Sequence, residues 1–160
     1  MNLKEKLDQY YSQYPANNLS PPAKLQDVLA LESELGFQIP NSLRELYLDY
    51  SNGGFGPGVF GVNGGYPDDE VEPTYFGDLY RALRDGRDDI PGFYWPDGLI
   101  PLASRGCGDY DCIDITTTDG VMIAYGPSGL EEGSDWGDVF YPLKTSFDGW
   151  MQLWLEGKLL

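Results

Sequence analysis

The spacing of apolar residues changes along the chain from a helical period to a strand period, and this change constrains the fold most. Apolar side chains recur every three or four positions in the early segments 3–14, 21–35 and 43–50. From Asp111 to Thr116 they alternate instead, as in a strand with one buried face. The final segment returns to the helical period, with one apolar stripe formed by Phe147, Trp150, Met151, Trp154 and Leu155. Helices, then antiparallel strands, then a C-terminal helix packed on the sheet predict an α+β domain.

Turn-forming residues predict where the early elements begin and end. Ser20 followed by Pro21 predicts the N-cap and the first residue of the second helix. Gly36 is placed to end that helix in the left-handed conformation. Asn52-Gly53-Gly54 ends the third helix, because these residue types tolerate a positive φ. A short strand is expected soon afterwards, at 59–62.

The second half of the chain predicts one more helix and an antiparallel sheet. A helix is expected at 75–84, and strands are expected at 99–103, 111–116, 121–125 and 139–141. Thr118-Asp119-Gly120 is a turn, so the strands on either side of it form the clearest hairpin. The chain shows no repeat and no linker, so its 160 residues predict a single domain over 1–160. Residues 1–20 form an N-terminal helical extension of it.

Negative charge is concentrated in one stretch of the chain. The formal net charge is −16, and residues 66–138 hold seventeen Asp and Glu against four Arg. Such a field repels nucleic acid and anionic membranes, and it speeds encounter with a basic partner. The alternative is that these carboxylates only keep the protein soluble.

Several kinds of chemistry are excluded by composition. The chain has no histidine, so no Ser-His-Asp or Cys-His centre can form. Its two cysteines, Cys107 and Cys112, cannot fill the usual four-ligand zinc shell. They form either a disulfide around a small turn or, as in a cytoplasmic protein, two free thiols. We expect no cofactor, no metal site and no catalytic residue.

The sequence also predicts where the protein resides. No apolar run is long enough to span a bilayer, and the first residues lack the apolar core of a signal peptide. We therefore expect a cytoplasmic protein that binds neither membrane nor nucleic acid.

Three stretches, in order, resemble a known family. The first, 31–40, is a helix end bearing an acidic residue, a glycine stop, a hydrophobic residue and a proline. The second, 43–54, is a helix closing on Asn-Gly-Gly, and the third, 99–125, joins an Ile-Pro-Leu strand, a Gly-Asp turn and a further strand. The terminal helix with Trp150 and Trp154 fits as well. From about residue 25 onwards the chain is similar to the SMI1/KNR4 family of the SUKH superfamily.

The resemblance implies a SUKH-like fold and a non-catalytic, protein-binding role. Bacterial members of the family are mostly immunity proteins that bind and neutralise a cognate toxin, often a nuclease. A basic toxin domain would suit the acidic stretch of this chain. Fungal members act as scaffolds in cell-wall signalling, so a scaffold or regulatory module is the alternative. A carboxylate-based hydrolase would need two facing acids, and the sequence alone reveals no such pair.

Three short segments supply candidate contacts for a protein partner. The turn at 106–114 carries Asp109, Tyr110, Asp111 and Asp114. The segment at 131–138 carries Glu131, Glu132, Asp135 and Asp138 around Trp136. The third segment holds Tyr94 and Trp95.

Each candidate segment has a second, structural interpretation. The carboxylates would steer a basic partner and the aromatic rings would supply contact energy. Alternatively, the acids are solvated turn residues, because turns favour Asp and Gly whatever their function. The aromatic rings would then be turned into the core.

Overall fold

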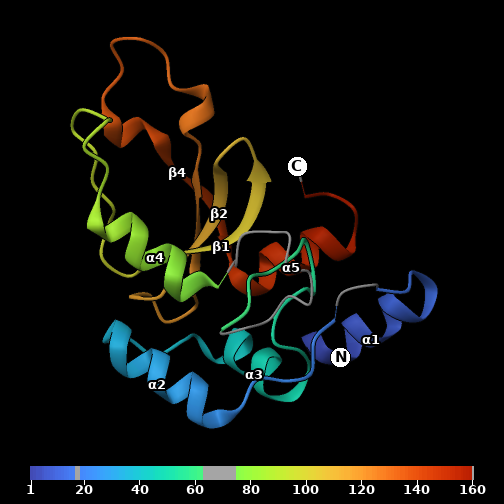
Figure 1. Ribbon diagram of the computed structural model, residues 1–160. Coiled ribbons are helices and arrows are strands. Elements are labelled where there is room, and N and C mark those ends of the chain that lie inside the picture. Colours follow the sequence, from blue (N-terminus) through green and yellow to red (C-terminus); the bar gives the residue numbers. More distant parts are fainter. Residues whose placement is uncertain (17–18, 63–74, 160) are drawn as a thin grey trace.

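The computed structural model describes residues 1–16, 19–62 and 75–159, which form the predicted α+β arrangement (Figure 1). The helices are α1 (Leu3–Gln13), α2 (Leu25–Leu35), α3 (Asn41–Asp49), α4 (Phe76–Asp85) and α5 (Phe147–Leu155). The strands are β1 (Leu99–Gly106), β2 (Asp109–Asp114), β3 (Val121–Tyr125) and β4 (Phe140–Ser146). Two short 3₁₀ helices, η1 (Pro127–Gly129) and η2 (Trp136–Val139), lie between β3 and β4.

The four strands form one antiparallel sheet in the order β1-β2-β3-β4. The predicted hairpin is confirmed as β2–β3, where Asp111 pairs with Ala124. The next pair along the same row is Ala124 with Tyr141 of β4. β2 ends two residues earlier than predicted, because the Asp114 carboxylate accepts a hydrogen bond from the Thr116 amide at 3.0 Å and turns the chain.

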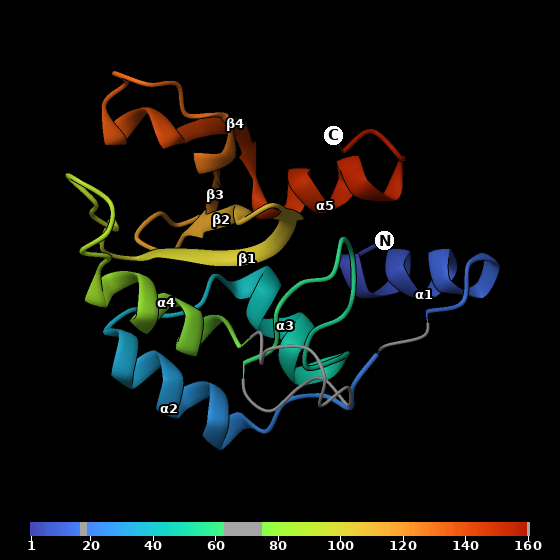
Figure 2. The ribbon, with the colours of Figure 1, turned by 45° about the horizontal axis from the view of Figure 1, so that its top comes forward.

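The helices are arranged around this sheet. Figure 2 shows α2, α3 and α4 below β1, and α5 with α1 to the right of the sheet. α5 is capped by Ser146, whose hydroxyl accepts a hydrogen bond from the Gly149 amide, and its Trp150 is fully buried. α1 packs beside α5, with Leu7 fully buried and the ring centroids of Tyr10 and Trp154 4.5 Å apart. The N-terminal helix is therefore packed into the hydrophobic core.

The predicted start of the second helix is wrong. α2 begins at Leu25, and its end at Gly36 has the expected left-handed φ of 78°. The residues before it are extended because their backbone groups bond to the end of α3. The Ala23 amide donates to the Tyr47 carbonyl at 2.7 Å, and the Pro21 carbonyl accepts from the Asn52 amide at 3.0 Å.

A buried carboxylate fixes the connection between α2 and α3. Glu32 is 7% exposed, and it accepts hydrogen bonds from the Ile39 amide at 2.8 Å and from Nε of Arg44 at 3.2 Å. A buried carboxylate is stable only with such partners. Glu32, an acidic residue of the stretch 31–40 that resembles the family, therefore has a structural role.

The strand predicted at 59–62 is also wrong, although the segment is buried. Its backbone groups bond at single points to several elements and form no continuous ladder. The Phe60 amide donates to the Leu102 carbonyl, and the Val62 amide donates to Oδ1 of Asn52, each at 2.8 Å. Gly53 packs closely against this segment, because a Cβ at Gly53 would be 2.8 Å from the Gly61 nitrogen. The Asn-Gly-Gly turn thus holds this segment in place.

Candidate protein-binding surface

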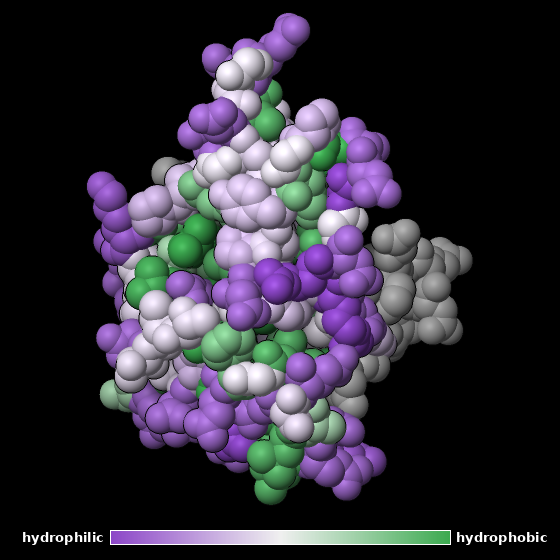
Figure 3. Space-filling model, turned by 90° about the vertical axis from the view of Figure 1, so that its left-hand side faces the viewer, coloured by the Kyte–Doolittle hydropathy of each residue, from purple (hydrophilic) through white to green (hydrophobic). Residues whose placement is uncertain are grey.

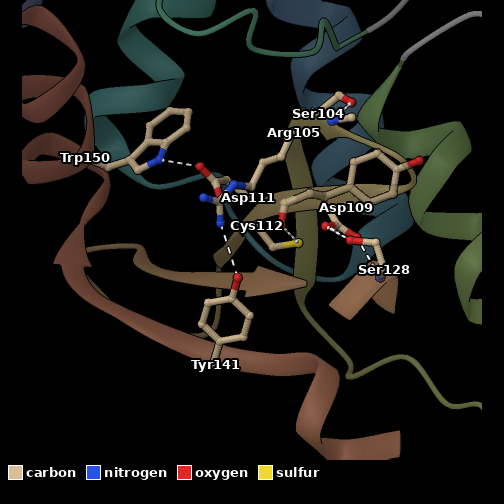
Figure 4. A network of polar contacts seen from close by, with 10 residues as sticks. Ser104, Arg105, Asp109, Asp111, Cys112, Ser128, Tyr141 and Trp150 are labelled. Carbon is tan, nitrogen blue, oxygen red and sulfur yellow. Dashed lines mark hydrogen bonds and ion pairs between the residues drawn. The ribbon is translucent and has the colours of Figure 1, made fainter. Parts of the chain in front are cut away.

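One row of side chains crosses the sheet from β2 to β4. Asp111, Ala124 and Tyr141 are cross-strand partners in turn, so their side chains project from the same face. α5 covers the Asp111 end of the row through Trp150, whereas Tyr141 at the other end is 44% exposed. Arg105 of β1 reaches between the two ends, as Figure 4 shows.

Asp111 is a buried carboxylate with one oxygen hydrogen-bonded. It is 4% exposed, and its Oδ2 accepts from the Trp150 indole Nε1 at 2.9 Å. Its Oδ1 has no hydrogen-bond donor among the described residues, and it lies 3.6 Å from Nη1 of Arg105. Burial raises the pKa of Asp111, while the Trp150 hydrogen bond and the Arg105 charge oppose this shift.

A hollow of about 370 Å³ lies beside this row, where η1 and the β3–β4 connection meet the sheet. Its polar lining is Asp109, Ser128, Glu131, Ser134, Asp138 and Tyr141. The Asp109 carboxylate accepts hydrogen bonds from the Ser128 amide at 3.0 Å and from the Ser128 hydroxyl, and so ties η1 to the start of β2. The chain thus brings together acids that are up to 29 positions apart, from Asp109 to Asp138.

The aromatic residues of the two neighbouring loops mostly face inwards. Trp136 is 8% exposed, donates its indole N–H to the Tyr94 carbonyl at 2.9 Å, and packs on Phe93 at 4.8 Å between ring centroids. Trp95 is also buried, and it donates to the Leu99 carbonyl at 2.6 Å. These two tryptophans hold the loops together, as expected if the aromatic rings are turned into the core. Their rings are not available to a partner in this conformation.

Of the predicted contact residues, only some meet at one place. Asp109, Glu131 and Asp138 line the hollow. The exposed Tyr94 is outside the lining, but its hydroxyl would lie 3.2 Å from a Cβ on Gly137, the residue before Asp138. The other predicted contact residues lie elsewhere. Glu132 and Asp135 are exposed but outside the lining, and Tyr110 is half-buried and stacked on Tyr125. Asp114 lies at the far end of β2 from Asp109, about 17 Å along the strand.

Sequence reasoning missed Arg105, Ser128 and Tyr141. Tyr141 was the end of a predicted strand, and nothing local indicates that its ring lies over the sheet. Gly126 permits this position, because a Cβ there would meet the Tyr141 ring at 3.2 Å. The position of the Tyr141 ring follows from cross-strand pairing, and predicting that pairing requires the register of three strands.

The surface around these loops is mostly hydrophilic. Figure 3 shows the side of the molecule with α2, α4 and the two loops, where hydrophilic side chains form most of the projecting loop at the top. Hydrophobic side chains lie in separate patches between the polar ones. The acids at 68–72, which extend the charged stretch in the sequence, lie outside the described residues.

The cysteines and carboxylates of the described residues were also candidates for metal binding or hydrolysis. Within the described ranges, no group of three or more Cys, Asp or Glu is arranged to hold a metal ion. Cys107 is an exposed free thiol, and Cys112 is a buried one whose pKa is raised well above its ordinary value by burial. Asp109 and Asp114 lie at opposite ends of β2 and so do not form the facing pair of acids that a carboxylate-based hydrolase needs. No helix in the described part of the chain has the length and apolar character needed to cross a bilayer.

The fold is an α+β domain, and its sheet carries an acidic hollow with an exposed tyrosine. Residues 22–153 match the model of the SMI1 / KNR4 family (SUKH-1), and the chain belongs to this family. Membership of this family supports a non-catalytic domain of the immunity or protein-interaction type. A search of curated proteins finds no match. α1 lies before the matched residues, although it is packed into the core.

Proposed function

We propose that this protein is an immunity protein that binds a basic, nuclease-type toxin domain and blocks its access to substrate. The supporting observation is the acidic hollow formed by Asp109, Glu131 and Asp138, with the exposed ring of Tyr141 in its lining and the exposed Tyr94 beside Gly137 of the same loop. The carboxylates steer a basic partner, and the two rings supply contact area at low entropic cost. Inhibition is stoichiometric, over an interface that typically buries about 1,600 Å² in total.

The test starts from the native cell. The tagged protein is used to capture partners from the lysate at low salt and again at high salt, and bound proteins are identified by mass spectrometry. The captured domain is then expressed alone and together with this protein. We expect the domain to arrest growth alone and the protein to restore it. Capture of cytoplasmic regulators whose expression is harmless would instead support a scaffold role.

The salt dependence of complex formation shows whether the carboxylates or the aromatic rings supply most of the binding energy. Exposed charge pairs weaken as salt rises, because the Debye length falls from about 10 Å at 0.1 M to about 3 Å at 1 M. A complex held mainly by the carboxylates is lost at high salt. A complex held mainly by Tyr94 and Tyr141 remains.

A further inference from the structure

The covered end of the Asp111–Tyr141 row contains a buried acceptor without a hydrogen-bond donor among the described residues. Oδ1 of Asp111 has no donor among the described residues, and the nearest cation, Nη1 of Arg105, is 3.6 Å away. The same Nη1 donates to the Tyr141 hydroxyl at 3.3 Å. Figure 4 shows the Asp111 carboxylate facing this guanidinium, with the Tyr141 hydroxyl on its other side. A buried carboxylate oxygen without a donor is costly, so its presence requires an explanation.

The adjacent hollow holds negative charge that no ion pair among the described residues neutralises. All ten Lys and Arg residues lie within the described ranges, and none of the ion pairs found there involves Glu131 or Asp138. Tyr141 belongs to both features, because its ring lines the hollow and its hydroxyl holds Arg105. Arg105 itself is outside the lining, so a ligand in the hollow reaches it through the Tyr141 hydroxyl.

We infer that the hollow receives one arginine side chain of the protein partner, between Glu131 and Asp138 and against the ring of Tyr141. This inference rests on the proposed function and identifies the chemical group that its surface recognises. A guanidinium has five donors in a planar fork, so it can bond to two carboxylates while its face lies on an aromatic ring. Gly126 permits this position of the Tyr141 ring, because a Cβ at Gly126 would be only 3.2 Å from the ring.

Docking also accounts for the unmade hydrogen bond. A second guanidinium beside Tyr141 repels Arg105 and competes for the Tyr141 hydroxyl. Arg105 then moves from 3.6 Å into hydrogen-bond distance of Asp111 Oδ1. The buried carboxylate thus gains its second partner only when the hollow is filled, which favours the bound state.

The test uses the full-length protein and a defined probe. Amide NMR spectra are recorded while the peptide acetyl-Gly-Arg-Gly-amide is added, and the matched control peptide carries citrulline in place of arginine. We expect saturable shifts at Ser128, Glu131 and Ser134 and at Nε of Arg105, and none with citrulline. E131Q/D138N should weaken binding about tenfold. E132Q/D135N removes the same charge from the same loop outside the hollow and should leave the affinity within about twofold.

Three results would overturn the inference. They are shifts spread over many acidic residues, equal shifts with the citrulline peptide, and equal loss of affinity in the two double variants. The growth assay separates this inference from the proposed function. If E131Q/D138N protects cells as well as the unmodified protein does, the arginine site is wrong and the immunity role stands. If the unmodified protein gives no protection, the immunity role fails, and the peptide titration still decides the arginine site.

Discussion

Nε1 of Trp150 donates a 2.9 Å hydrogen bond to Oδ2 of Asp111, and this bond joins α5 to the central strand β2. Trp150 is fully buried and Asp111 is 4% exposed, so water cannot replace either partner. A hydrogen bond to a buried charged acceptor is among the stronger ones in proteins. The position of the C-terminal helix on the sheet therefore depends on this pair as well as on apolar packing.

Trp150→Phe tests the contribution of this bond. The substitution removes the indole donor and leaves the Asp111 carboxylate with neither oxygen hydrogen-bonded, and it also removes buried volume. We expect a loss of about 3 kcal/mol in the free energy of unfolding, measured by urea denaturation. Trp154→Phe is the matched control, because Trp154 is only partly buried, and it should cost clearly less. Equal costs would show that the Asp111 bond adds nothing beyond packing.

The raised pKa of Asp111 predicts a pH dependence of stability. Burial favours the neutral carboxyl, so between the unfolded pKa of about 3.9 and the higher folded pKa the native state binds more protons than the unfolded chain. The contribution of Asp111 to stability therefore rises as pH falls through this window. The difference in unfolding free energy between the unmodified protein and Asp111→Asn should grow in favour of the unmodified protein from pH 7 towards pH 4. Parallel curves would contradict the prediction.

Local periodicity predicted the helices and the hairpin because each is decided by residues close in sequence. It placed α1, α4, α5 and the β2–β3 hairpin near their observed bounds, and Gly36 ends α2 as expected. Ser20–Pro21 and 59–62 failed for one reason. Both segments satisfy backbone groups with distant residues, Asn52 for Pro21 and Leu102 for Phe60, and no local pattern encodes these partners.

The binding surface was less accessible to sequence reasoning than the fold. The acids of the hollow were identified by charge, but Trp136 was also considered as an exposed anchor and proves to be buried against Phe93. Burial of a ring depends on contacts about forty positions away. Arg105 and Tyr141 were missed because their meeting depends on strand order and register. Charge composition indicates the kind of partner, whereas the row across the sheet can be recognised only in three dimensions.

Gly53 and Gly58 give a matched pair for the close contact at the Asn-Gly-Gly turn. Both have a positive φ, 96° and 84°, so alanine at either position is strained. A Cβ at Gly53 would lie 2.8 Å from the backbone nitrogen of Gly61, whereas a Cβ at Gly58 meets nothing within 4 Å. We expect Gly58→Ala to cost about 1 kcal/mol and Gly53→Ala about 3 kcal/mol in thermal or urea unfolding. Similar costs would mean that the backbone at 61 moves away freely.

The last prediction concerns α1, which precedes the family-matched residues 22–153. Leu7 is fully buried, the Lys6 ammonium donates to Oε1 of Gln152 at 2.8 Å, and the Tyr11 hydroxyl accepts from the Gly56 amide at 3.0 Å. These contacts reach α5 and the segment after α3, so α1 should unfold together with the domain. Leu7→Ala should cost about 3 kcal/mol without changing the denaturant m-value.

Leu29→Ala is the control for this prediction, because it removes the same atoms from a helix position that is 49% exposed. It should cost less than about 1 kcal/mol, since a half-exposed side chain leaves no cavity. If Leu7→Ala costs no more than Leu29→Ala, or if hydrogen exchange shows the amides of α1 opening far more often than those of α5, then α1 is an independent appendage. Protection of α1 equal to that of α5 would make it part of the cooperative unit that holds the binding surface.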